Sequence, residues 1–121
     1  MTQEYIIDKI TEAAESVGWY VTTYEQDDGS VNVNFNTDTK FGQDLNCWGT
    51  LGSDGDYQSL ADEIYRWYEG YDPEEETMLW VGPDGHGKNG APYHLSDVLA
   101  DMEDAESRLE VLANALQQLD I

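Results

Sequence analysis

Residues 95–119 read LSDVLADMEDAESRLEVLANALQQL, and no other stretch of the chain constrains its architecture as strongly. Apolar residues recur in it at steps of three and four for about seven turns, which predicts one long amphipathic helix. These residues are Leu95, Val98, Leu99, Met102, Ala105, Leu109, Leu112, Leu116 and Leu119. We expect this helix to bury its apolar stripe by covering a sheet, or by pairing at its far end with a second copy of the chain.

The sheet is expected in the first half of the chain. Residues 31–36 alternate between apolar side chains and Asn, and residues 44–51 alternate in the same manner. This alternation predicts antiparallel strands with one buried face. Residues 19–24 are aromatic and β-branched, which favours a third strand. The intervening Asp27-Asp28-Gly29-Ser30 carries the Asp-Gly signal of a hairpin, so we predict a three-stranded meander.

Helical spacing also occurs in residues 3–17 and 57–69. Met78 to Val81 is a short apolar run, which predicts either a fourth strand or a packed connector. Gly82 to Pro92 is rich in Gly and Pro and is expected to be a loop. The predicted order is α-β-β-β-α-(β)-α, an α+β fold, and we expect the 121 residues to form a single domain.

The charge of the chain is its most unusual property. Asp and Glu number 26 against 5 Lys and Arg, so the formal net charge is −21. A small domain usually carries a net charge of roughly 2–8 in magnitude. Self-repulsion on this scale opposes a compact state, and direct binding to DNA, RNA or an anionic membrane depends on Lys and Arg. The surplus of acids therefore calls for a functional reason other than binding nucleic acid or membranes directly.

The sequence gives little support for catalysis. Gly82 to Asn89 approaches the phosphate-loop pattern, but Asn89 stands where a hydroxyl would hold Mg²⁺, and Gly90 and Pro92 disrupt the helix that should follow. Cys47 lies on the apolar side of its predicted strand and is expected in the core. We expect no catalytic residue, no cofactor and no metal ion, and a protein that is not an enzyme.

Three features indicate a cytoplasmic protein. No apolar run reaches the length of about 18 residues that a membrane helix needs. The N-terminal segment is acidic and lacks the regions of a secretory signal. Cys47 is the single cysteine, so no internal disulfide forms, and a reducing compartment is expected.

The acids are densest in residues 54–76 and 97–110. One flank of the long helix carries Asp97, Asp101 and Asp104, and the other carries Glu103, Glu106 and Glu110. Steps of three and four residues place these carboxylates about 4.5–6 Å apart along the axis, on the scale of phosphates in a DNA strand. We predict as partner-binding residues Asp62, Glu63, Glu69, Tyr71, Asp72, Glu74, Glu75, Glu76, Asp97, Asp101, Glu103, Asp104, Glu106 and Glu110.

Aromatic side chains are expected near the surface beside these acids. Tyr65, Tyr68, Tyr71 and Trp48 are the candidates. Tyr and Trp are favoured anchors of protein interfaces, and solubility alone gives no reason to expose them. The combination favours a binding surface for a basic protein.

Several segments resemble a known group of proteins. They are Tyr71-Asp72-Pro73-Glu74-Glu75-Glu76, then Leu79-Trp80, then Gly87-Lys88-Asn89-Gly90-Ala91-Pro92, then the acidic helix from Leu95 to Leu116. They are similar to small acidic proteins that phages and conjugative elements of gut bacteria carry beside antirestriction and anti-CRISPR genes. In size and charge the chain also resembles anti-CRISPR and antirestriction DNA mimics. The resemblance implies an inhibitor of a defence nuclease and no catalytic residues.

These observations lead to one expected function and two alternatives. We expect a non-enzymatic inhibitor in the cytoplasm of a bacterial host, acting as a DNA mimic in the nucleic-acid groove of a CRISPR effector such as Cas9, or of a restriction enzyme. The first alternative is an acidic module of a mobile element that binds a different basic protein. The second is a halophilic small domain whose acids serve solubility.

Thermal unfolding in low salt separates the inhibitor from the halophile. A salt-adapted domain needs molar salt to screen its self-repulsion, whereas an inhibitor has to fold under physiological conditions. We expect a cooperative thermal transition at about 0.1 M salt, followed by circular dichroism. A transition that emerges only above about 1 M salt would support the halophilic domain instead.

Overall fold

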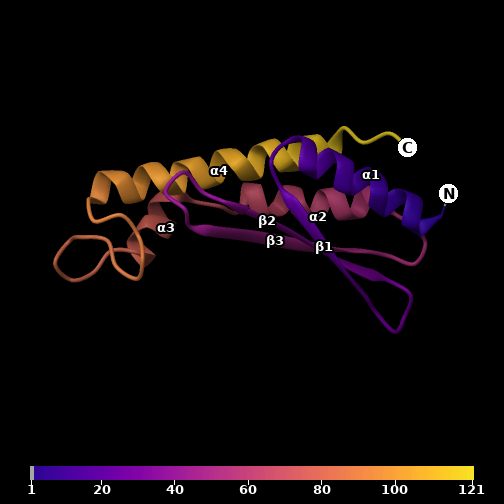
Figure 1. Cartoon of the computed structure of the whole chain (residues 1–121), viewed down its shortest axis with the longest axis horizontal. Coiled ribbons are helices and arrows are strands. Elements are labelled where there is room, and N and C mark those ends of the chain that lie inside the picture. Colours follow the sequence, from indigo (N-terminus) through magenta and orange to yellow (C-terminus); the bar gives the residue numbers. More distant parts are fainter. Residues whose placement is uncertain (1) are drawn as a thin grey trace.

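The structure is a computed structural model that describes residues 2–121, and its elements follow the order α-β-β-β-α-α-α (Figure 1). The elements are α1 (Gln3–Ser16), β1 (Tyr20–Glu25), β2 (Val31–Asp38), β3 (Asp44–Leu51), α2 (Tyr57–Glu69), α3 (Pro73–Leu79) and α4 (Leu95–Gln117). The α+β class, the antiparallel meander and the long C-terminal helix are confirmed.

The sheet has the order β1-β2-β3, and both pairs are antiparallel. On β2, Val31, Val33 and Phe35 are buried and alternate with half-buried Asn residues. Helices α1, α2 and the C-terminal half of α4 pack over the buried face, and their apolar side chains join those of the sheet in one core. The alternation along β2 therefore sets which face of the sheet the helices cover.

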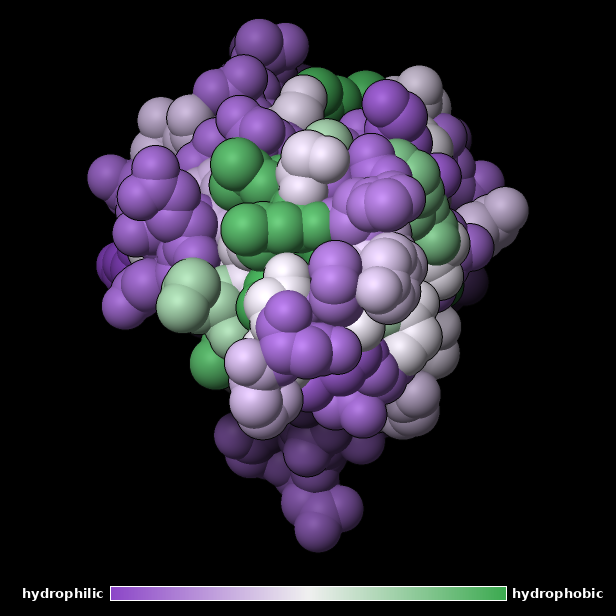
Figure 2. Space-filling view, turned by 90° about the vertical axis from the view of Figure 1, so that its left-hand side faces the viewer, coloured by the Kyte–Doolittle hydropathy of each residue, from purple (hydrophilic) through white to green (hydrophobic). Residues whose placement is uncertain are grey.

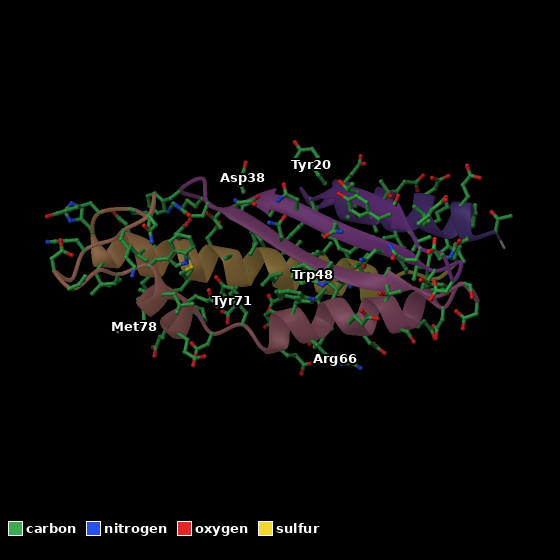
Figure 3. All side chains as sticks on the ribbon, turned by 90° about the horizontal axis from the view of Figure 1, so that it is seen from below. Tyr20, Asp38, Trp48, Arg66, Tyr71 and Met78 are labelled. Carbon is green, nitrogen blue, oxygen red and sulfur yellow. The ribbon has the colours of Figure 1, made fainter. Side chains whose placement is uncertain are left out.

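In the part of the chain that the structure describes, residues 2–121, no helix packs across the other face of the sheet, although Trp67 of α2 reaches Trp48 at its β3 edge. Figure 3 shows this face turned toward the viewer in front of α4, with Tyr20 and Trp48 on it. The strand register places Asn34 between Thr22 and Trp48, and Asn36 beside Tyr20. Tyr20 and Trp48 are among the exposed large side chains of the protein. Amides, hydroxyls and aromatic rings thus form the central part of this uncovered face.

A buried tryptophan joins the first strand to the last helix. Trp19 is 1% exposed, and its indole Nε1 donates to the backbone oxygen of Arg108 at 3.2 Å. The turn before it passes through Gly18 at φ 90°, a left-handed conformation that glycine adopts at little cost. The Gly18 oxygen accepts a hydrogen bond from Thr37 Oγ1 at 3.0 Å, which ties the turn to the end of β2.

Of the two alternatives predicted for Met78 to Val81, a fourth strand and a packed connector, the described residues do not form the fourth strand. Residues 73–79 form the short helix α3, with Asp72 as its N-cap and Pro73 in its first turn. Proline fits the first turn of a helix because it has no N–H to satisfy there, and the acids that follow it favour the positive end of the helix dipole. Val81 forms only an isolated bridge with Gly87, so the segment 80–94 is a loop with one bridge.

Cys47 lies in the core, as predicted, and gives the fold a characteristic response to alkaline pH. Its side chain is fully buried, and burial raises the pKa of the thiol from 9.0 to about 12. The unfolded chain loses this proton near pH 9, whereas the folded chain keeps it. The contribution of this thiol to the free energy of unfolding should therefore be constant below pH 9 and should fall, by up to about 1.4 kcal/mol per pH unit, as the pH rises above it.

Urea unfolding at pH 7, 9 and 10 measures this effect. We expect Cys47→Ala to be less stable than the natural chain at pH 7, because it leaves a small cavity, but to lose less further stability between pH 9 and 10. An identical loss in both proteins over this interval would show that the buried thiol is not the group responsible.

Candidate interaction surface

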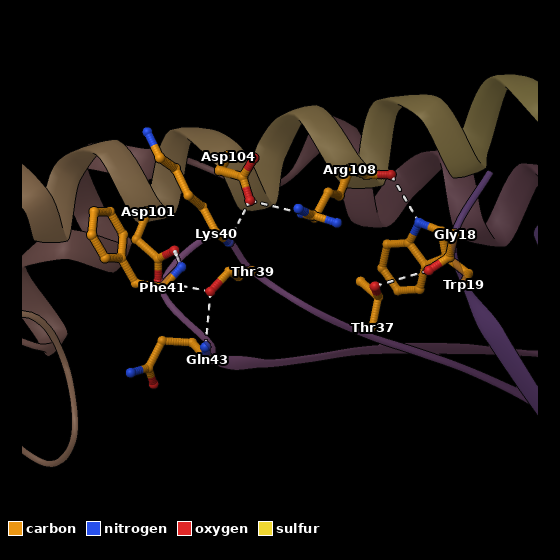
Figure 4. Close-up of polar contacts among 10 residues, drawn as sticks. All are labelled: Gly18, Trp19, Thr37, Thr39, Lys40, Phe41, Gln43, Asp101, Asp104 and Arg108. Atoms are coloured by element: carbon orange, nitrogen blue, oxygen red, sulfur yellow. Dashed lines mark hydrogen bonds and ion pairs between the residues drawn. The ribbon is translucent and has the colours of Figure 1, made fainter.

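The two acidic flanks of α4 have different surroundings. The aspartate flank faces the turn between β2 and β3, as Figure 4 shows. Asp101 is completely buried and accepts hydrogen bonds from Thr39 Oγ1 at 2.8 Å and from the Phe41 backbone N–H at 2.9 Å. A buried carboxylate needs such partners, and this one receives them from a segment about 60 residues away in sequence. Asp101 therefore attaches α4 to the sheet.

Asp101 and Asp104 correct the predicted set of partner-binding residues. Asp101 is buried and is not accessible to a partner. Asp104 is half-buried and accepts from the Lys40 backbone N–H and from Arg108 Nε, both at 2.7 Å. Helical spacing places these carboxylates on a flank of the stripe, but the neighbouring turn binds them. Asp97, on the same flank, stays partly exposed near the start of α4.

Glu63 also has a structural contact. Its Oε2 accepts a hydrogen bond from the backbone N–H of Thr50, an edge residue of β3, at 3.1 Å. One turn later, Trp67 Nε1 donates to the backbone oxygen of Trp48 at 3.0 Å, and the two indoles pack edge to face with centroids 4.5 Å apart. Helix α2 thereby covers the edge of β3, so Glu63 serves the fold.

The glutamate flank of α4 lies toward α2 and solvent. Glu103 and Glu110 are exposed, and Glu106 is half-buried. Tyr68 on α2 donates its hydroxyl proton to Glu110 Oε2 at 2.6 Å. This hydrogen bond, with burial and the charges of Glu110 and Glu106, raises the pKa of Tyr68 to about 12. The flank therefore combines three carboxylates with a tyrosine that stays protonated at neutral pH.

Helix α3 adds acids beside this flank because it packs on α4. Asp72 caps α3 by accepting from the Glu74 backbone N–H at 3.0 Å, and Glu74 and Glu75 are exposed. Tyr71, just before the cap, is half-buried, and its hydroxyl donates to Met102 Sδ at 3.3 Å. Burial, followed by the charge of Glu76, raises the pKa of Tyr71. The predicted aromatic and acidic residues thus meet where α3 lies against α4.

We use the term acidic face for the remaining predicted carboxylates of α2, α3 and the glutamate flank. These residues are Asp62, Glu69, Asp72, Glu74, Glu75, Glu76, Glu103, Glu106 and Glu110. Asp62 accepts from Gln117 Nε2 at 2.9 Å, which links α2 to the end of α4. The ion pairs of the described residues are Lys9–Glu12 and Arg108–Asp104, so no acid of this face is neutralised by one.

A cleft beside Tyr71 supplies a carboxylate that sequence reasoning missed. The cleft has a volume of about 380 Å³, and Asp44, Trp67 and Glu76 are among its lining residues. Asn36 and Asn46 donate their side-chain amides to Asp44 and lower the pKa of its carboxyl. The sequence signal for this group is the spacing of Asp44 and Asn46, which lie two residues apart and so share one face of the predicted strand. The register with β2 places Asp44 opposite Asp38.

An apolar area borders the acids at the end of the molecule where α4 begins. Figure 2 shows hydrophobic side chains in the middle of this end with hydrophilic ones around them. Met78 and Leu79 of α3 are 70% and 66% exposed, and Leu95 at the start of α4 is 49% exposed. Exposed apolar area rimmed by polar groups is a common feature of interaction sites.

Two further findings bear on the chemistry of the surface. Among residues 2–121, no group of three or more His, Cys, Asp or Glu side chains is arranged to hold a metal ion. None of the helices in this part of the chain combines the length and the apolar character needed to cross a bilayer.

The chain matches no model of a protein family, and searches of curated proteins and of solved structures found no significant match.

Replacing Asp101 tests its structural role. Asp101→Ala removes the acceptor of two hydrogen bonds and leaves a buried hydroxyl and a backbone N–H without it, so we expect a loss of roughly 2 kcal/mol in the free energy of unfolding. Glu103→Ala, two residues along the same helix but exposed, is the matched control and should change the stability by less than about 0.5 kcal/mol. Equal effects of the two substitutions in urea unfolding would contradict the assignment.

Proposed function

We propose that this chain is a non-enzymatic inhibitor that uses its acidic face to occupy the nucleic-acid-binding groove of a bacterial defence nuclease. A CRISPR effector is the first candidate target and a restriction enzyme the second. The observation that supports the proposal is the acidic face, where carboxylates from three packed helices lie together without a compensating ion pair.

The arrangement of the acids has an energetic cost that solubility does not require. Like charges four residues apart destabilise a helix by about 0.2–0.5 kcal/mol per pair, and Glu106 and Glu110 form such a pair on α4. Residues 62–76 contain one basic side chain, Arg66 on α2, and it is exposed. Retaining this uniform charge on rigid helices favours a surface that a basic partner recognises.

The proposed mechanism is competitive. Lys and Arg side chains that normally hold phosphates would pair with the carboxylates of the acidic face, and the field of a chain with net charge −21 would accelerate the encounter. Tyr65 and Tyr68 lie among these acids, and their rings pack edge to face with centroids 5.7 Å apart. Such rings fill the spaces between charged pairs at interfaces. In Cas9-type enzymes, arginines that recognise the short PAM sequence are the groups such a surface would block.

An acidic module that binds some other basic protein is the second candidate function. The same exposed carboxylates support it, and the two functions differ in the consequence of binding. Cleavage of plasmid DNA by a guide-loaded Cas9 and by a restriction endonuclease, each with increasing amounts of the protein, distinguishes them. Inhibition of either nuclease supports the proposal, and full cleavage by both at saturating protein would favour the acidic module.

Removing charge from the acidic face should weaken inhibition strongly. The test variant combines Glu69→Gln, Glu74→Gln, Glu75→Gln and Glu103→Gln, whose side chains are exposed and accept no hydrogen bond in the structure. We expect at least a tenfold loss of inhibition, about 1.4 kcal/mol, and a flatter dependence of binding on salt.

The matched control removes the same charge from another part of the surface. It combines Asp8→Asn, Glu12→Gln and Glu15→Gln on α1 with Asp27→Asn in the β1–β2 turn. A clearly smaller loss is expected for this control. Equal losses would indicate diffuse electrostatics without a defined interface, and full binding by both variants at about 1 M salt would contradict the proposed mechanism.

A further inference from the structure

The two edge strands of the sheet, β1 and β3, differ in whether helix side chains bond to their outward-facing backbone groups. At the β3 edge, Glu63 and Trp67 of α2 bond the backbone of Thr50 and Trp48. No helix side chain bonds the backbone of β1 in the described part of the chain. An edge strand with unpaired N–H and C=O groups is a template for a further strand, and proteins usually guard it.

The hydrogen-bond alternation shows which groups of β1 face outward. Gln26 N–H donates to the Ser30 oxygen at 2.9 Å, in line with the β1–β2 register. Because bonded pairs alternate in an antiparallel ladder, the residues at even positions of β1 bond to β2. The backbone N–H and C=O groups of Val21, Thr23 and Glu25 therefore point to the open edge.

Apart from Glu25, the residues of β1 include none of the types that usually prevent a further strand from pairing with an edge. The strand reads YVTTYE, so β-branched and aromatic residues fill it, and Glu25 at its end is the only charged side chain. It contains neither Pro nor Lys, and its register with β2 continues without a bulge from Tyr20 to Glu25. These are the devices that block strand addition in other proteins, so β1 is available for pairing.

A cleft lies beside the open edge on the side of the sheet that α1 covers. It has a volume of about 420 Å³, and its lining includes Glu4 and Ile7 of α1, Thr23 and Glu25 of β1, and Val31 of β2. Lys and Arg are absent from its lining. A strand paired with β1 would place every second side chain on this side, so the residue opposite Thr23 would enter a cleft with an apolar wall and two carboxylates.

We propose that the β1 edge binds an extended segment of a partner protein by strand addition, with a Lys or Arg side chain of that segment in the cleft between Glu4 and Glu25. Backbone hydrogen bonds would supply affinity, and the cleft would supply specificity, as in other cases of strand addition. A second copy of this chain does not fit, because its β1 strand has no cation to offer. The proposal concerns α1 and β1 and does not depend on the acidic face.

Amide hydrogen exchange with a synthetic peptide tests the proposal. The probe is a seven-residue peptide of alternating Thr and Lys. At saturation it should slow exchange at least tenfold at the amides of Val21, Thr23 and Glu25. A peptide of equal charge with alternate backbone nitrogens methylated controls for unspecific attraction to the acidic protein, and should give no such protection.

Two variants complete the test. Thr23→Pro removes an outward N–H at a position where an edge strand tolerates proline, so the fold should persist while the affinity for the probe falls at least tenfold. Thr23→Ala keeps the N–H and only shortens a side chain of the cleft lining, so it should lose clearly less affinity than Thr23→Pro. The double variant Glu4→Gln with Glu25→Gln should bind the probe at least threefold more weakly.

Three results would contradict strand addition by a partner protein. Equal affinity of the natural chain and Thr23→Pro for the probe, or protection confined to the amides of α2 to α4, would overturn the proposal. Protection of β1 without peptide that grows with protein concentration, together with dimers in sedimentation, would show that a second copy occupies the edge.

Discussion

The buried carboxylate of Asp101 fixes how α4 lies on the sheet, and most other features of the molecule depend on that orientation. A buried carboxyl group needs hydrogen-bond partners, and the β2–β3 turn supplies them through Thr39 and Phe41. The indole of Trp19 holds the same helix further along, at the backbone oxygen of Arg108. With two such contacts about two turns apart, α4 cannot rotate about its axis, and its glutamate flank is directed away from the sheet.

This orientation separates the acids by role. On the inner flank, Asp101 and Asp104 are compensated by hydroxyl, backbone and guanidinium donors, so their charges contribute to the fold. On the outer flank, the acids meet other acids of α2 and α3. Tyr68 is one of the few groups that relieve them, through its bond to Glu110. Self-repulsion is therefore concentrated on the acidic face, where a partner rich in Lys and Arg would remove it.

Sequence reasoning succeeded where a period extends over several turns or residues. The stripe of α4 and the alternation of β2 are such cases, and both were predicted within a few residues. It failed at α3, whose seven residues are too short for a helical period and whose signals are the Asp72 cap and Pro73. It also failed to separate Asp101 from Glu103, because both lie beside the stripe, and a turn remote in sequence decides which one is buried.

The net charge explains how the fold can leave a strand edge unprotected against further copies of the chain. Proteins usually guard such edges against their own copies, and two molecules that each carry −21 repel one another before their edges can meet. The acids Glu4 and Glu25 in the lining of the edge cleft strengthen this repulsion locally, since a second copy would bring the same charges there. The same charges attract a cationic strand. Electrostatics can therefore select the occupant of the β1 edge, while the uniform backbone pattern of the edge supplies the hydrogen bonds.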